Sequence, residues 1–144
     1  MTGVSQPTIS RMIRKLEEEG VVKEHTIIPD LRKMGMELLA ITFGAWSTEK
    51  IKNYSEEIRV EKAKKFLSEH PNVIFASSGE GLGMGRMMVT VHKNYSDYTE
   101  FMRHARTEWA GLVKLESFII SLETDVATFP FTLRNLGKYL EKTN

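Results

Sequence analysis

The sequence predicts an α+β protein in which a short basic helix and a linker precede a ferredoxin-like βαββαβ domain. The main observation is the order of apolar patterns from Glu37 to Thr124, which reads strand, helix, strand, strand, helix, strand. This is the order of the split βαβ fold. The second observation is a separate helical pattern between Ser5 and Gly20. The chain has 144 residues, 41% of them hydrophobic, and is long enough to bury one core.

The first helix is predicted between Ser5 and Gly20. The Ser5 hydroxyl can cap its start, and Pro7 is tolerated in its first turn. Gly20 can take the left-handed conformation that ends a helix. Apolar residues recur at i, i+4 and i+7, so that one face carries Ile9, Ile13 and Leu16. The helix is therefore amphipathic. We expect it either to fray or to dock its apolar face on another subunit.

The polar side of this helix carries three cations and has no acid before Glu17. Hydrogen-bonding side chains near a helix start, with cations beyond them, suit a major groove, where the former read base edges and the latter hold phosphates. An ordinary amphipathic surface helix is the alternative interpretation. The candidate DNA-binding residues are Ser5, Gln6, Thr8, Ser10, Arg11, Arg14 and Lys15.

The following elements alternate between linker, strand and helix patterns. Val21–Ile28 is β-prone and predicts a hinge strand, and Leu31–Met36 predicts a turn that breaks at Gly35. The predicted strands are Glu37–Gly44, Val73–Ser78, Met87–His92 and Leu115–Leu122. One helix ends near Glu69, before His70-Pro71-Asn72, and the next is capped by Asn94 or Ser96 and carries Tyr98, Phe101, Met102, Ala105 and Trp109. A short terminal helix over Thr132–Lys142 follows Phe129-Pro130-Phe131.

Two helices cover one face of such a sheet, and the other face is predicted to be apolar. Its predicted residues are Leu38, Ala40, Ile74, Ala76, Met88 and Ile119. Soluble monomers avoid a large exposed apolar patch. We therefore expect a second subunit to cover this face.

A glycine-rich segment, Gly79–Arg86, joins the second and third strands. It lacks the Gly-Lys-Ser/Thr ending of a P-loop, and a strand follows it instead of a helix. It is either a flexible hairpin loop or a ligand loop at a subunit interface. Arg86 favours an anionic ligand, because a guanidinium matches a carboxylate. The candidate effector-binding residues are Ser78, Gly79, Gly81, Gly83, Gly85 and Arg86.

Residue types and their spacing argue against several classes of function. The four histidines lack metal-ligand spacing and there is no cysteine, so no metal or cofactor is expected. Nothing resembles a nucleophile–base pair, so the protein is not expected to be an enzyme. Lys62, Lys64 and Lys65 predict a solvated helix face, and Trp46 and Trp109 predict packing. No apolar run has the length of a membrane span and no signal peptide opens the chain, which predicts a cytoplasmic protein with no membrane partner.

The order of residues in the first third of the chain resembles the Lrp/AsnC family of helix-turn-helix regulators. The match to that family's recognition helix and its exit is carried by Gly3-Val4-Ser5-Gln6-Pro7-Thr8-Ile9-Ser10-Arg11, then Ile13 and Leu16-Glu17-Glu18-Glu19-Gly20-Val21-Val22. The next segment resembles the family's linker into its effector domain, through Ile27-Ile28-Pro29-Asp30, Leu31 and Gly35.

This resemblance implies a sequence-specific DNA-binding transcription regulator that a small-molecule effector modulates. It implies a homodimer in which the hinge strand pairs with its twin, with an octamer as a larger assembly. It also implies that the hairpin helps to bind an amino acid or other carboxylate between subunits, with Gly79 at the family's opening glycine. The family commonly has an acidic-aromatic pair before the third strand, where this sequence has Gly85-Arg86 or Arg86-Met87.

The resemblance begins almost at Met1, and the helices that should precede a recognition helix are not in this sequence. The predicted units are a partial helix-turn-helix (1–22), a hinge strand and linker (23–36), a ferredoxin-like effector and oligomerisation domain (37–126) and a C-terminal extension (127–144). Because the first helix of such a unit holds the second in the groove, we expect this chain to bind DNA weakly. The alternative function is a stand-alone ligand-binding and oligomerisation module with no DNA binding of its own.

Overall fold

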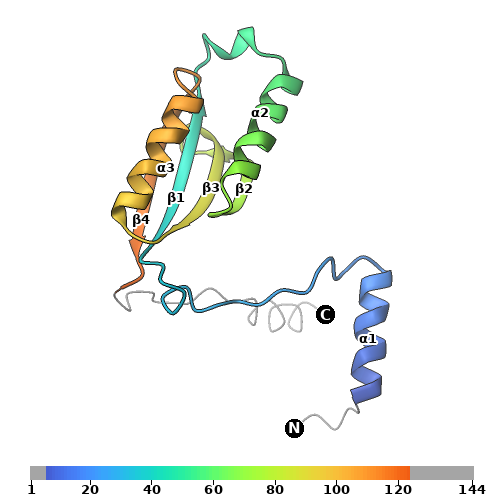
Figure 1. The fold of residues 1–144 in the computed structure, drawn as a ribbon. Helices are drawn as coiled ribbons and strands as arrows, with labels where there is room; N and C mark the ends of the chain where they lie inside the picture. The colour runs from blue at the N-terminus through green and yellow to red at the C-terminus, as the bar shows by residue number, and fades with distance from the viewer. Residues whose placement is uncertain (1–5, 124–144) are drawn as a thin grey trace.

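The computed structural model describes residues 6–123, and Figure 1 shows their arrangement. Helix α1 lies at one end of an extended segment, away from a four-stranded sheet that carries two helices. The helices are α1 (Gln6–Glu18), α2 (Glu56–Glu69) and α3 (Tyr95–Glu108), with a short 3₁₀ helix η1 (Ile51–Asn53). The strands are β1 (Leu38–Trp46), β2 (Val73–Gly81), β3 (Met84–His92) and β4 (Val113–Ser121).

The sheet is antiparallel and its strand order is β2-β3-β1-β4. Chain order and strand order together are those of a ferredoxin-like βαββαβ domain, so the predicted α+β class is confirmed. The predicted cap at Ser5 and the predicted terminal helix over Thr132–Lys142 lie outside the described residues.

Helix α1 ends as its sequence predicts. Gly20 has a φ of +71°, in the left-handed region. The N–H of Val21 donates to the carbonyl of Leu16 at 2.9 Å, and the N–H of Gly20 donates to that of Glu17 at 3.0 Å. This pair of bonds is a Schellman motif, which satisfies two carbonyls that the end of the helix would otherwise leave open.

The hinge strand predicted over Val21–Ile28 is not present in this single chain. These residues have no regular secondary structure among the described residues. A strand forms only where another backbone runs beside it to complete the hydrogen-bond ladder, and β-propensity alone does not supply that partner. The turn predicted after it is present, and Gly35 ends it with a φ of +79°.

The helices cover the sheet face that was predicted to be open. Ala40 and Thr42 are buried there, and Leu38 and Met88 pack against the same core. The prediction was therefore wrong for Leu38, Ala40, Ala76, Met88 and Ile119, which the strand register places on the helix side. Ile74 sits at a register shift in β2 and is exposed. Period-two alternation separates two faces but does not say which one the helices cover, and here both are apolar.

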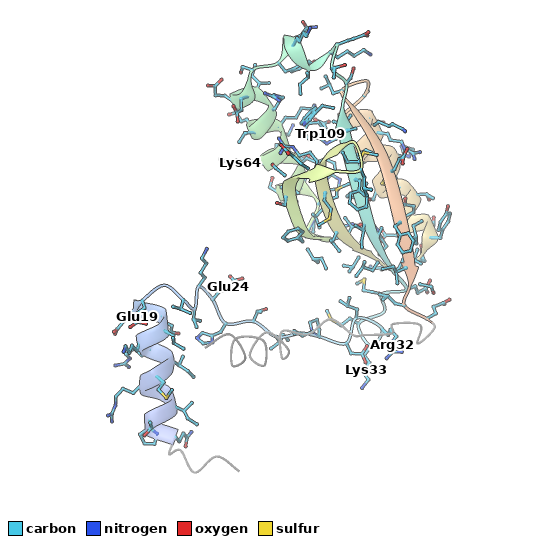
Figure 2. All side chains as sticks on the ribbon, turned by 180° about the vertical axis from the view of Figure 1, so that it is seen from behind. Glu19, Glu24, Arg32, Lys33, Lys64 and Trp109 are labelled. Carbon is cyan, nitrogen blue, oxygen red and sulfur yellow. The ribbon has the colours of Figure 1, made fainter. Side chains whose placement is uncertain are left out.

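The opposite face, here called the open face, carries the alternate residues of the same strands. Two of its aromatic side chains, Phe75 and Phe118, are 50% and 63% exposed. No described helix lies on it, as the views from the two sides show (Figure 1 and Figure 2). The register assigns to it Leu39, Ile41, Phe43, Phe75, Met87, Val89, Val91, Phe118 and Ile120.

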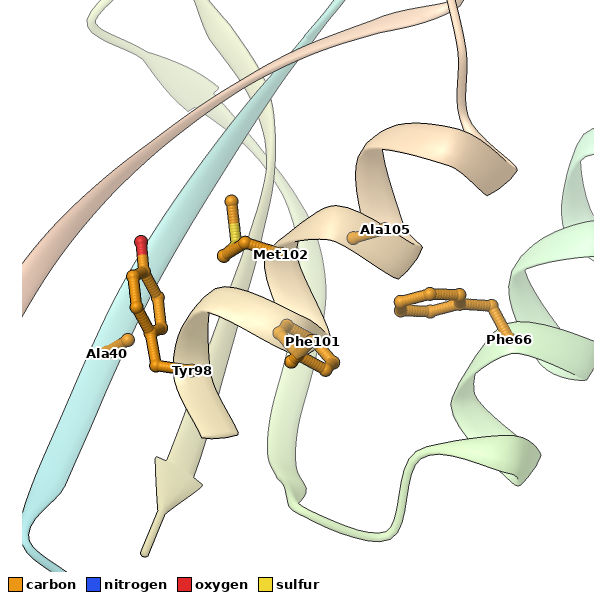
Figure 3. Close-up of a cluster of buried hydrophobic side chains, with 6 residues drawn as sticks. All are labelled: Ala40, Phe66, Tyr98, Phe101, Met102 and Ala105. Atoms are coloured by element: carbon orange, nitrogen blue, oxygen red, sulfur yellow. The ribbon is translucent and has the colours of Figure 1, made fainter. Parts of the chain in front are cut away.

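The core lies between α3 and the sheet, with one contribution from α2 (Figure 3). Ala40 of β1 and Ala105 of α3 are both fully buried. Small side chains at these two positions leave room for the larger ones of the cluster. The cluster is completed by Phe66, Tyr98, Phe101 and Met102.

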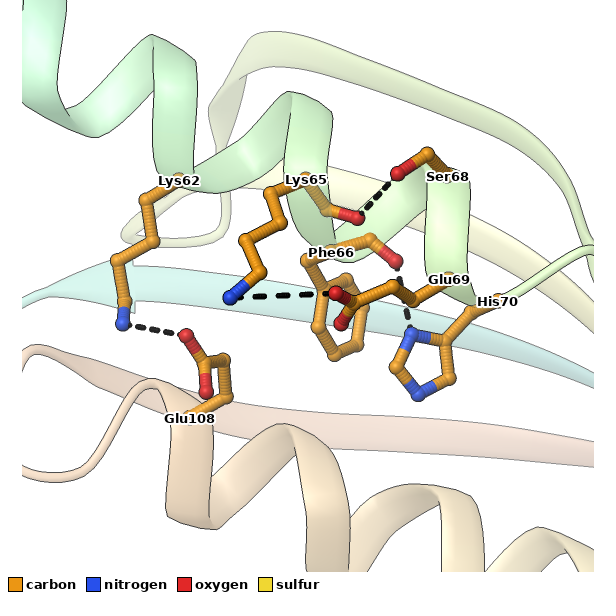
Figure 4. Close-up of polar contacts among 7 residues, drawn as sticks. All are labelled: Lys62, Lys65, Phe66, Ser68, Glu69, His70 and Glu108. Carbon is orange, nitrogen blue, oxygen red and sulfur yellow. Dashed lines mark hydrogen bonds and ion pairs between the residues drawn. The ribbon is translucent and has the colours of Figure 1, made fainter.

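Helix α2 is held mainly by α3. Phe66 is its only residue buried in the described structure, and the Phe66 ring centroid lies 5.9 Å from that of Phe101. His70 stacks on Phe66 with ring centroids 4.2 Å apart. The Lys62 ammonium donates to the Glu108 carboxylate at 2.6 Å, and this bond lowers the pKa of Glu108 (Figure 4). Lys62 is therefore a tether to α3 rather than the fully solvated cation that was predicted.

A buried histidine anchors the start of α3. His92 is fully buried, and its Nε2 lies 2.8 Å from the Thr90 hydroxyl. Its Nδ1 lies 3.4 Å from the carboxylate of Asp97 and has no hydrogen-bond partner among the described residues. Burial lowers the pKa of His92, and the nearby Asp97 opposes that shift only in part. The folded protein therefore holds this ring neutral near pH 7.

We predict that the free energy of unfolding decreases as the pH falls below about 6.5, the pKa of an unperturbed histidine. The unfolded chain then binds a proton at His92 that the folded chain does not, which costs at most about 1.4 kcal/mol per pH unit. Urea unfolding between pH 5 and 8 measures this slope. It should flatten in His92→Gln and persist in His25→Gln, a change at an exposed site. Equal slopes in the wild type and in both variants would mean that His92 titrates alike in the folded and the unfolded chain.

Candidate functional site

Helix α1 presents its polar residues to solvent on the side away from its apolar stripe. Gln6, Ser10 and Arg14 form one i,i+4 row, and Arg11 and Lys15 form another. All of α1 is exposed in the described structure, and Lys15 makes one ion pair, with Glu19 at 3.6 Å. The structure therefore groups six of the seven predicted DNA-binding residues on one helix, and the seventh, Ser5, lies outside the described residues.

The glycine-rich segment is a strand hairpin, not the longer loop that was predicted. β2 continues to Gly81 and β3 begins at Met84, so the turn consists of Leu82 and Gly83 alone. Both have positive φ, 54° and 69°, as a type I′ hairpin turn requires. A register shift between Ser78 and Gly81 absorbs the extra residue as a bulge. Sequence reasoning missed this turn because leucine rarely adopts a positive φ.

The hairpin gathers four of the six predicted effector residues around an open hollow of about 410 Å³ on the open face. Phe43 and Phe75 form its apolar wall. Gly83 and Gly85 do not line it. The predicted residues that line it are Ser78, Gly79, Gly81 and Arg86.

Arg86 also reaches the helix-covered side of the sheet. It donates to the Ser78 hydroxyl across the β2–β3 ladder, and its guanidinium lies 5.7 Å from the ring centroid of Trp46. The guanidinium of Arg59, from α2, lies at the same distance from that ring. Trp46 packs edge-to-face on Trp109 at 5.8 Å, so the predicted packing role of both tryptophans is confirmed. No local pattern signalled that Arg59 and Arg86 meet at one ring, because the pairing of β1 with β3 brings Arg86 there and the packing of α2 brings Arg59.

The histidines are not brought together as metal ligands. His70 and His104 pack their rings edge-to-face, 6.1 Å apart, and His92 is buried elsewhere. Within residues 6–123, no three histidine, aspartate or glutamate side chains are grouped in a way that can hold a metal ion. Over the same range, no helix combines the length and the apolar character that crossing a membrane requires.

Comparison with known proteins places this architecture. No protein-family model and no curated protein matches the chain. Among solved structures, an AsnC family transcriptional regulator from Agrobacterium tumefaciens matches with a TM-score of 0.67 and 18% identity, covering 93% of this chain and 82% of that one. A transcriptional regulator from Neisseria meningitidis, in complex with L-methionine, matches with a TM-score of 0.67 and 13% identity, covering 92% and 80%.

A third match is a feast or famine regulatory protein from M. tuberculosis complexed with L-methionine, with a TM-score of 0.65 and 19% identity, covering 90% of this chain and 80% of that one. The class defined by the structure is thus an α+β protein in which a separate helix is joined to a ferredoxin-like domain. More particularly, the chain has the fold of the Lrp/AsnC regulators, and the predicted resemblance is confirmed at that level.

We predict that Leu82→Asn stabilises the hairpin by about 0.5–1 kcal/mol. Leucine is strained at a φ of 54°, whereas asparagine tolerates this region and Asn-Gly is a favoured type I′ pair. Leu82→Ala is the matched control, because it removes the same exposed side chain but keeps the strain. Urea unfolding measures all three proteins. Equal stability of the asparagine and alanine variants would contradict a strained turn.

Proposed function

We propose that this protein is a DNA-binding transcription regulator of the Lrp/AsnC type. In this proposal α1 contacts DNA, the open face forms a homodimer, and the β2–β3 hairpin helps to bind a small-molecule effector. The observation that carries the proposal is the pairing of a solvent-exposed basic helix with a domain whose fold is that of regulators. The function needs neither catalysis nor a cofactor, and it belongs in the cytoplasm, where DNA is accessible.

The polar side of α1 supports the DNA-contact role. Its cations Arg11, Arg14 and Lys15 stand on a helix whose first turn has no acid, so phosphates meet no nearby negative charge there. Gln6 and Ser10 have side chains that can donate to and accept from base edges when the helix lies in a major groove. Three cations support weak, salt-sensitive contact, so strong binding needs a second copy or a further brace.

One observation favours the alternative, a ligand-binding and assembly module without DNA binding of its own. The apolar stripe of α1 is open to solvent in the described structure, with Ile9 46% and Met12 59% exposed. Burying a large apolar side chain contributes about 1.5–3 kcal/mol, and α1 gains none of this from the rest of the described chain. A helix of this length is marginal in water without such packing. A DNA titration distinguishes the two functions, because only the regulator binds DNA.

We predict that Arg11→Ala lowers affinity for the DNA upstream of the protein's own gene. A base contact should be worth about 1–3 kcal/mol at one position, whereas a phosphate contact should weaken all duplexes alike and reduce the salt slope by about one. Fluorescence anisotropy near physiological salt measures this for the 144-residue chain and for a form extended upstream in frame. Arg103→Ala, at an exposed site on α3, is the control. Unchanged binding in Arg11→Ala, to both specific and nonspecific duplex, would remove Arg11 from the interface.

We also predict that sedimentation at micromolar concentration shows a dimer and no monomer. Phe118 is 63% exposed on the open face, and burying it against a second copy contributes about 1.5–3 kcal/mol per side chain. Phe118→Glu should give a monomer with an unchanged circular dichroism spectrum, because the glutamate faces solvent in the free subunit. Tyr95→Glu changes an equally exposed aromatic residue on α3 and should stay dimeric. A wild-type monomer would overturn the dimer.

A further inference from the structure

A cavity of about 380 Å³ opens between α2 and the helix-covered side of the sheet, apart from the open face. Its volume lies in the range of small-molecule sites. Apolar side chains from both helices and from the sheet line most of it. They include Ala63, Phe66, Ala76, Met88, Ala105 and Leu115.

The cavity lies beside the contacts that fix α2 to α3. Phe66 and the Lys62–Glu108 bond fix α2 to α3, as Figure 4 shows for the polar contacts. The other apolar residues of α2 that line the cavity remain open, with Val60 43% and Leu67 38% exposed. Apolar walls that stay this exposed inside a fold can gain free energy from an apolar occupant.

The charges that line the cavity have one sign. Arg59 and Arg86 each place a guanidinium 5.7 Å from the ring centroid of Trp46, and Lys64 lies on the α2 side. Figure 2 labels Lys64 and Trp109, both of which line the cavity. Aspartate and glutamate are absent from the described residues of the lining. A guanidinium pairs best with a planar carboxylate, which it can hold through two hydrogen bonds.

We propose that this cavity binds a small apolar monocarboxylate, with its carboxylate between Arg59 and Arg86 and its tail against Ala63 and Ala76. An α-amino acid fits less well, because its ammonium would enter a cation-lined cavity without an acidic partner. The cavity lies on the helix-covered side of the sheet and the hairpin hollow on the open face, and the two share Ser77, Ser78, Arg86 and Met87 at their edges. The inference rests on the proposed function only for its consequence, since Arg86 also reaches the hairpin through Ser78.

The test compares matched probes on the full 144-residue chain without DNA. Isothermal titration near pH 7 uses 3-phenylpropionate, L-phenylalanine and 3-phenylpropanol, which share a ring and differ in their charged groups, with octanoate as a linear carboxylate. We expect saturable binding of 3-phenylpropionate or octanoate, and at least tenfold weaker binding of both L-phenylalanine and the alcohol. No saturable binding of either carboxylate, or equal binding of L-phenylalanine, overturns the proposal.

Variants locate the binding. Arg59→Gln and Arg86→Gln should each weaken the carboxylate by about tenfold, through loss of a charge-assisted hydrogen bond. Arg103→Gln, whose side chain is 68% exposed and paired with Glu100, should bind as the wild type does. Loss of binding in the control, or full binding in both cavity-arginine variants, would place the carboxylate elsewhere.

A filled cavity gives an independent check. Ala63→Phe should abolish carboxylate binding while thermal unfolding stays cooperative, and Ala76→Ile serves where Ala63→Phe does not fold. Full binding by a folded, filled variant overturns the proposal. DNA affinity is measured separately on the same proteins, so a chain that binds carboxylate but not DNA retains the site and loses only the proposed regulator function.

Discussion

The burial of the apolar stripe of α3 against the sheet sets the rest of the domain. Tyr98, Phe101, Met102 and Ala105 are all buried there, together with Ala40 of β1. Phe101 also meets Phe66, with ring centroids 5.9 Å apart, and this contact joins α2 to the same core. Phe66 is the one buried residue of α2 in the described structure, and the cavity lies beside it, between α2 and the sheet.

The same sheet has two surfaces that differ in what covers them. Its helix side packs apolar residues under the helices and also holds polar pairs, such as the Thr42 and Ser117 hydroxyls 2.8 Å apart. Its open face has bulky apolar side chains and no described cover. Exposed apolar surfaces of this kind are typical of protein–protein interfaces, and the dimer proposed above would cover this one.

The sequence predicted the helices and their ends better than the long-range contacts that they make. Local rules located α1, its Gly20 end, and the Asn94 cap, whose side chain accepts from the Asp97 N–H at 2.9 Å. These features depend on residues within one turn of each other. The hinge strand is absent from this single chain, where no described segment pairs with it, and the sheet faces were exchanged because alternation does not record which side a helix crosses. The meeting of Arg59 and Arg86 at Trp46 depends on register between distant segments, which no local pattern contains.

The segment between α1 and β1 has a geometric consequence for the proposed regulator. It contains no described helix or strand, and residues 22–30, between the end of α1 and the turn at Leu31–Met36, can span about 30 Å when extended. Two α1 helices carried by one dimer would thus be held at high local concentration near one DNA duplex. Half-sites of an operator lie about 34–36 Å apart for each helical turn, and two such tethers from one dimer can reach that spacing. In the proposed regulator, the length of this tether therefore limits how far apart two target sites can lie on the DNA.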